Sequence, residues 1–110
     1  MTHPDVELNY NTISSNWNDA DGKPDGGQTC GMGFTIAWQR GPLNEGRNGA
    51  FIIDVLDACI KQMQYYQQGE FRCDENVGVI EHLEHAIDLL KFRRNRRKDS
   101  GSLGTHKTDV

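Results

Sequence analysis

The chain has 110 residues, of which 35% are hydrophobic, and its formal net charge is −4. That length fits one domain with a modest core, and the polar composition indicates that self-association covers part of its surface. There is no run of about 20 apolar residues that would predict a transmembrane helix, and no signal peptide is visible at the N-terminus. Cys30, Cys59 and Cys73 have no paired spacing, which favours free thiols in a reducing cytosol over a disulfide framework.

Charge is distributed unevenly along the chain. Residues 1–90 hold 14 acidic and 5 basic side chains, a net charge of −9, whereas residues 91–110 hold 7 basic and 2 acidic ones, a net charge of +5. An acidic body repels phosphate backbones, and a nucleic-acid-binding domain usually has a whole basic face. We therefore expect neither a nucleic-acid nor a membrane partner, and we expect the positive charge to form one compact site.

The first part of the chain, residues 1–47, is predicted to form a small β-sheet with loops. Apolar side chains alternate with polar ones over residues 6–13, which indicates a short strand. The turn-forming residues from Asn18 to Gly27 predict a loop. A second, half-buried strand is predicted from Phe34 to Trp38, and it ends in a turn at residues 40–42.

Two long helices are predicted in the second part of the chain. They cover residues 48–68 and 74–98, with Asn48 and Asp74 as N-caps. The connection between them is only about six residues long, so the helices must be antiparallel neighbours. The expected fold class is α+β: a small N-terminal antiparallel sheet, a long two-helix hairpin and a tail over residues 99–110, in a single oligomeric domain.

Both predicted helices carry apolar residues on more than one face. The main stripe of the first helix contains Ile52, Leu56, Cys59, Met63 and Tyr66, with Val55 beside it. The main stripe of the second helix contains Val77, Ile80, Leu83, Ile87 and Leu90. Cys59 is therefore expected in the core. Other apolar residues lie off these stripes: Phe51, Ile53, Ile60, Tyr65, Val79, Ala86, Leu89 and Phe92. Two helices alone cannot bury all of these, so the hairpin is expected to pack on the sheet and on another protomer.

Several short motifs have both a structural and a functional interpretation. The six cations of residues 91–98 suit the negative end of a helix dipole, yet an arginine can also bind phosphate or stack on a flat ring. His82 and His85 lack a third ligand at a useful spacing, so a solvated face is favoured over a metal site. The segment from Cys30 to Gly33 lacks the full glycine fingerprint of a phosphate-binding loop and favours a turn. No catalytic motif is recognisable, which disfavours an enzyme.

Three aromatic residues and an amide surround the connection between the helices, in the segment from Gln64 to Asn76. They can simply close the turn. They can also form a platform for a nucleobase, with Tyr66 or Phe71 stacking on the ring and Asn76 binding a polar edge.

Together these segments resemble the phage Thoeris anti-defence proteins of the first described type, over about residues 33–107. The resemblance is carried by FTIAWQRGPL, NGAFIIDVLDACIKQMQYYQ, FRCDENVGVIEHLEHAIDLLKFRRNRR and a final GTHK. The helical hairpin is also similar to the related anti-CBASS sponges, which bind cyclic dinucleotides and trinucleotides.

The resemblance implies a non-catalytic sponge in the cytoplasm of the infected bacterium, with no cofactor and no metal. It would capture a cyclic ADP-ribose isomer made by a TIR-domain enzyme, in pockets between subunits of a homodimer or a hexamer. The implied ligand contacts are Tyr66, Asn76 and Arg93, with Arg94 as a substitute for Arg93 and Arg40 as the nearest candidate for a further arginine. Residues 39–42 and the tail with Thr105 and His106 are candidate lids.

Helix geometry limits how these residues can meet. Asn76 and Arg93 lie 17 positions apart on one helix, about 25 Å along its axis, so they cannot bind the same small ligand from one chain. The arginine must then come from a second, antiparallel protomer, and a twofold interface would create two equivalent pockets. Other functions stay open: a sponge for cyclic di- or trinucleotides, a nucleic-acid-binding hairpin, and a scaffold without a ligand. An enzyme that cleaves the ligand has no support in the sequence.

Overall fold

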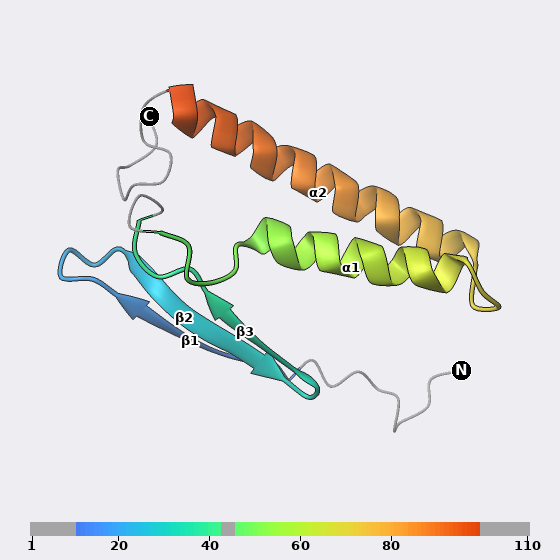
Figure 1. Cartoon of the computed structure of the whole chain (residues 1–110), viewed down its shortest axis with the longest axis horizontal. Helices are drawn as coiled ribbons and strands as arrows, with labels where there is room; N and C mark the ends of the chain where they lie inside the picture. Colours follow the sequence, from blue (N-terminus) through green and yellow to red (C-terminus); the bar gives the residue numbers. More distant parts are fainter. Residues whose placement is uncertain (1–10, 43–45, 100–110) are drawn as a thin grey trace.

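The computed structural model describes residues 11–42 and 46–99 (Figure 1). Three strands, β1 (Ile13–Asn18), β2 (Pro24–Gly31) and β3 (Phe34–Trp38), precede two helices, α1 (Ile52–Gln67) and α2 (Asp74–Asp99). An antiparallel sheet followed by an antiparallel helical hairpin confirms the predicted α+β arrangement of a single chain. The strand predicted over residues 6–13 falls almost entirely outside the described residues, and so do most of the tail and both of its candidate ligand residues, Thr105 and His106.

The sheet has the order β1-β2-β3, and both neighbouring pairs are antiparallel. The loop predicted from Asn18 to Gly27 is wrong at its end, because Pro24 already begins the central strand. Gly27 is buried, and an added Cβ would lie 2.4 Å from the carbonyl oxygen of Ser15 on β1. Glycine here permits the close approach of a neighbouring strand, whereas in the sequence it resembles a turn residue.

The two connections within the sheet are short turns. Between β1 and β2, Asp19 Oδ1 accepts hydrogen bonds from the backbone N–H groups of Asp21 and Lys23, both at 2.9 Å. Between β2 and β3, Gly33 adopts a φ of 88°, which a residue with a side chain rarely adopts. This second turn confirms the interpretation of the segment from Cys30 to Gly33.

The start of α1 differs from the prediction. Asn48 does not cap the helix, which begins four residues later than expected, at Ile52. The residues before the helix instead extend the sheet: Gln39 N–H donates to Ala50 O, and Ala50 N–H donates to Ala37 O. The Asp54 carboxylate then accepts a hydrogen bond from the Phe51 N–H at 2.8 Å and satisfies one free donor of the first turn.

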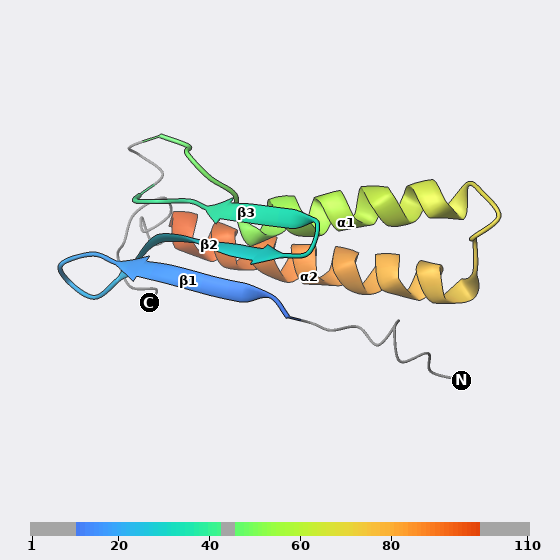
Figure 2. The same ribbon diagram turned by 90° about the horizontal axis from the view of Figure 1, so that it is seen from below.

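The two helices lie side by side (Figure 2), and few of their side chains are well buried. Ile60 is 6% exposed and is the only fully buried hydrophobic side chain in the described part of the chain. Cys59, expected in the core, is exposed. Neighbouring helical positions point about 100° apart, so a shift of the interface by one position exchanges these two residues. The half-buried apolar side chains of the two helices are those of Ile53, Val55, Leu56, Met63, Ile80, Leu83, Ala86, Ile87 and Leu90.

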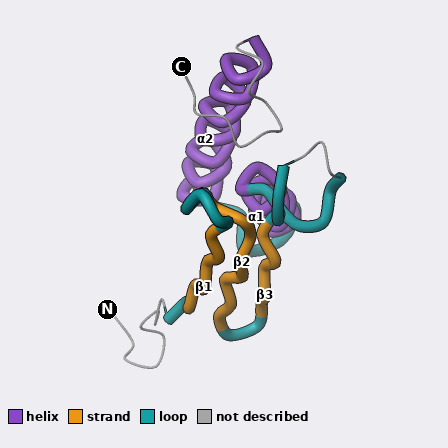
Figure 3. The backbone as a smooth tube through the Cα atoms, turned by 90° about the vertical axis from the view of Figure 1, so that its left-hand side faces the viewer, coloured by secondary structure: helices purple, strands orange, loops and turns teal. Residues whose placement is uncertain are grey.

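The sheet leaves much of the apolar surface of the helices uncovered. α1 lies between the sheet and α2 (Figure 3), and no Cα atom of the strands comes within 8 Å of a Cα atom of either helix over residues 11–42 and 46–99. Leu89 and Phe92 on α2 are 59% and 71% exposed. A single chain thus buries few of the apolar residues that lie off the main stripes. Neither described helix is long and apolar enough to cross a membrane.

Candidate ligand-binding site

The turn between the helices is built around the side chain of Gln67. Its Oε1 accepts hydrogen bonds from the Cys73 N–H and from Asn76 Nδ2, both at 2.9 Å, and its Nε2 donates to Cys73 O at 3.2 Å. Asn76 Nδ2 also donates to Phe71 O at 3.0 Å. These bonds join the last turn of α1 to the first turn of α2, where backbone groups have no partner within a helix.

Three of the predicted site residues meet beside this turn. Tyr66, Phe71 and Asn76 line an open hollow of about 340 Å³, the turn hollow. Phe71 is 70% exposed, so one face of its ring is available for stacking. Tyr65 packs on Tyr66 with ring centroids 5.9 Å apart and supports that ring from the side. The hollow therefore combines two aromatic rings with one amide, which suits a flat ring that has a polar edge.

A second open hollow, the basic hollow, has a volume of about 450 Å³ and lies near the other end of α2. It is lined by Lys91, Arg94, Asn95 and Lys98. Their spacing of three, one and three residues places them on one face of the helix. Three cations on one face create a positive potential suited to phosphate groups. Of the two arginines considered from the sequence, Arg94 lines this hollow and Arg93 does not.

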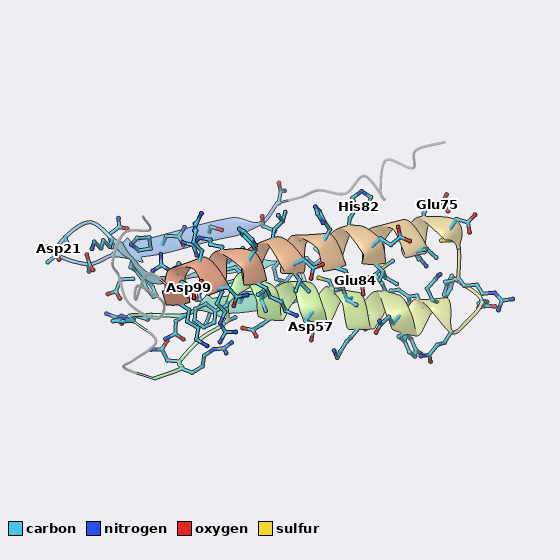
Figure 4. All side chains as sticks on the ribbon, turned by 90° about the horizontal axis from the view of Figure 1, so that it is seen from above. Asp21, Asp57, Glu75, His82, Glu84 and Asp99 are labelled. Atoms are coloured by element: carbon cyan, nitrogen blue, oxygen red, sulfur yellow. The ribbon has the colours of Figure 1, made fainter. Side chains whose placement is uncertain are left out.

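The two hollows are far apart in one chain. Figure 4 shows Glu75 and Asp99 at opposite ends of α2. Asn76 and Arg94 lie 18 positions apart, which corresponds to about 27 Å along the helix axis. The structure thus brings Tyr66, Phe71 and Asn76 together and keeps both arginines away from them.

Arg40 lies in the segment that joins β3 to α1. The N-terminal end of α1 and the C-terminal end of α2 lie toward the same side of the molecule, and α2 extends past the start of α1 (Figures 1 and 2). The guanidinium lies 5.9 Å from the centroid of the Trp17 ring and 3.8 Å from the Asp25 carboxylate. Asn48 accepts a hydrogen bond from Arg40 N–H and donates one to Arg40 O, both at 2.8 Å. This use of Asn48 explains why it does not cap α1.

Metal-ligating side chains do not cluster within residues 11–42 and 46–99: no three His, Cys, Asp or Glu residues could hold an ion together. His82, one member of the histidine pair, bonds through Nδ1 to Gly78 O at 2.7 Å on its own helix. That contact occupies one ring nitrogen within the helix.

Two features of these sites were not predicted from the sequence: the cationic face of the basic hollow and the role of Gln67 in the turn. The spacing of Lys91, Arg94, Asn95 and Lys98 could have revealed one cationic face within the basic run. Gln67 gave no comparable signal, because its partners Cys73 and Asn76 are reached only after the chain reverses direction.

No protein-family model matches the chain. Over 73 residues the chain is 40% identical to Thoeris anti-defense 1 of Bacillus phage SBSphiJ7. The resemblance found in the sequence is confirmed. The aligned residues make up 66% of this chain and 51% of the phage protein, so the chain spans about half the length of the relative that it matches.

Proposed function

We propose that this protein counteracts bacterial Thoeris defence by binding a cyclic ADP-ribose isomer made by a TIR-domain enzyme and holding it uncleaved. The name of the relative, Thoeris anti-defense 1, supports the anti-Thoeris role. The observation that carries the sponge mechanism is the pair of complementary hollows, one aromatic and one cationic. The protein would act in the cytoplasm of the infected cell, without a cofactor or a metal.

The complete pocket in this proposal forms between two protomers. A second chain packed antiparallel would place its basic end beside the turn of the first chain, and twofold symmetry would repeat the pocket at the other end. Two physical features support such packing. The exposed Leu89 and Phe92 need a partner surface, and one chain buries fully only Ile60 among the described hydrophobic side chains.

The charges of α2 favour the antiparallel arrangement over the parallel one. Residues 74–88 contain five acidic side chains and no lysine or arginine, whereas residues 91–98 contain six cations. Antiparallel pairing places the acidic half of one helix beside the cationic half of its partner, and parallel pairing would bring like charges together. Larger assemblies of such dimers, including a hexamer, are compatible with this arrangement.

The chemistry of the ligand fits the two hollows. An adenine ring would stack on Phe71 and Tyr66, and its polar edge would meet Asn76. The pyrophosphate would bind the partner's Arg94 and its neighbouring lysines through charge-assisted hydrogen bonds. No bond of the ligand needs to break, so the function depends on slow release.

The test is a capture experiment with a panel of cyclic ADP-ribose isomers. The protein is incubated with each isomer, washed free of unbound ligand and denatured by heat, and the released compound is identified by mass spectrometry. We expect one isomer to return intact in stoichiometric amount. A hydrolysed product would refute the sponge and indicate an enzyme, and capture of no isomer would refute the proposed ligand class.

A sponge for cyclic di- or trinucleotides is the second candidate. The observation that favours it is the presence of Lys91, Arg94 and Lys98 on one helix face, since three cations can neutralise more than one phosphate. The same capture experiment with cyclic oligonucleotides decides between the two ligand classes.

A further inference from the structure

The amide of Asn76 has a fixed orientation in the turn hollow. Both hydrogens of Nδ2 are used, one by Gln67 Oε1 and one by Phe71 O. Rotation of the amide by 180° would direct Oδ1 at these two oxygens, and acceptors that face each other repel. Only the observed orientation satisfies this network.

Gln67 is fixed in turn by the backbone of Cys73. The N–H of Cys73 donates to Oε1, and the carbonyl of Cys73 accepts from Nε2. In a reversed Gln67 amide, the Nε2 donor would face the Cys73 N–H donor, and the Oε1 acceptor would face the Cys73 carbonyl acceptor. Gln67 Oε1 must therefore point toward Asn76. The orientation of the Asn76 amide thus depends on a chain of contacts that begins at the backbone.

The hydrogen-bonding group that Asn76 has left for a ligand is an acceptor. No side-chain nitrogen or oxygen atom of the described residues is buried without a hydrogen-bond partner, and no hydrogen bond to Asn76 Oδ1 is seen within the described residues, so this atom is not fully buried. Asn76 is one of three residues that line the hollow. A ligand edge that meets it needs an N–H or O–H donor.

We propose that Gln67 is a positioning residue that sets the hydrogen-bond polarity of the turn hollow, so that the site selects an aminopurine edge over an oxopurine edge. Adenine offers an exocyclic amine, whereas hypoxanthine offers a carbonyl oxygen at the same position. An oxygen there would face Asn76 Oδ1 without a hydrogen between them. The inference deepens the proposed function and rests on it, because it assumes that the hollow holds the base of the ligand.

The test compares the captured cyclic ADP-ribose isomer with its hypoxanthine counterpart, prepared by deamination. We expect the wild-type protein to bind the adenine compound at least about tenfold more tightly. In Gln67→Met, which keeps the length of the side chain and removes its polar groups, this ratio should fall toward one. Gln68→Met is the matched control, because Gln68 is adjacent and exposed, and it should keep the wild-type ratio.

Amide hydrogen exchange gives a readout that needs no ligand. The Cys73 N–H should exchange faster in Gln67→Met than in the wild type and stay unchanged in Gln68→Met, while far-UV circular dichroism shows both variants folded. Equal affinity of the wild type for both compounds, or an unchanged ratio in Gln67→Met, would overturn the inference and leave the sponge intact. Capture of neither compound would refute the proposed function and, with it, this inference.

Discussion

A pocket shared between two protomers predicts that two defective variants restore each other's binding. Phe71→Ala removes a stacking ring from the turn hollow and should weaken capture by about 1–3 kcal/mol. Arg94→Ala removes a charge from the basic hollow and should cost about 1.5–3 kcal/mol. Phe71 is 70% exposed, and its side chain takes no part in the hydrogen bonds of the turn, so the fold should tolerate its loss.

The size of the restoration follows from counting pockets. In a dimer of one Phe71→Ala chain and one Arg94→Ala chain, one pocket combines both lesions and the other combines two intact halves. Random exchange of equal amounts makes half of the dimers mixed, so about a quarter of all pockets should regain wild-type affinity. A pocket contained within one chain would regain none, because every chain carries a lesion.

The assay refolds the two variants together from denaturant and titrates the mixture with the captured isomer by calorimetry. We expect a tight site at about a quarter of the wild-type stoichiometry. A mixture of Phe71→Ala with Tyr66→Ala is the control, because both lesions lie in the turn hollow and no mixed dimer has an intact turn. The absence of a tight site in the first mixture, with dimers present in sedimentation, would refute the intersubunit pocket.

Three further predictions concern the fold and the role of charge. Ile60→Ala should lower the free energy of unfolding by about 2–4 kcal/mol in denaturant titrations, because Ile60 is the buried centre of the helix interface. Gly27→Ala should destabilise the sheet by about 2 kcal/mol or more, since its Cβ would meet Ser15 O. Relative to the wild type, amide exchange in the variant should become faster in β1 and β2 than in the helices. Uniform protection of strands and helices would contradict this prediction. Capture should weaken as salt rises from 0.05 to about 0.5 M if Arg94 and its lysines bind phosphate, and an affinity independent of salt would exclude that role.

The helices could be predicted well because their determinants are local. The hydrophobic spacing, the short connection and the N-terminal Asp74 each depend on residues that are close together in the chain. α2 accordingly starts at the predicted residue. The start of α1 could not be predicted in this way. Asn48 has the side chain of a capping residue, but its amide oxygen and nitrogen bind the backbone of Arg40, eight positions earlier. Competition from a distant partner is not visible in a local capping pattern.

β2 shows a similar limit. Its first four residues, Pro24 to Gly27, have the composition of a turn, and only the pairing with β1 and β3 makes them a strand. β-structure depends on neighbours across the sheet more than on the residues of the strand itself. The burial of Ile60 in place of Cys59 belongs to the same class of error, because adjacent apolar positions leave the direction of the interface open until the partner helix is placed.

The sequence could group only those residues of the candidate site that are close together in the chain. Tyr66, Phe71 and Asn76 lie within eleven positions around one turn, and they line one hollow. Helix geometry alone also required the arginines to lie far from them. The choice of Arg94 over Arg93 was left open in the sequence, although the spacing of Lys91, Arg94, Asn95 and Lys98 on one helix face was already visible there.

Asn76 has a structural role that changes how its substitution must be interpreted. Its two donor bonds hold Gln67 and the carbonyl of Phe71, so Asn76→Ala removes the proposed ligand acceptor and also loosens the turn that carries Phe71. Weaker capture by Asn76→Ala is then expected both for a direct contact and for a purely structural effect. The ratio between the adenine and hypoxanthine compounds separates the two: loss of a contact reduces selectivity, whereas a loosened turn weakens both compounds alike. For this residue, selectivity rather than affinity reports the contact with the ligand.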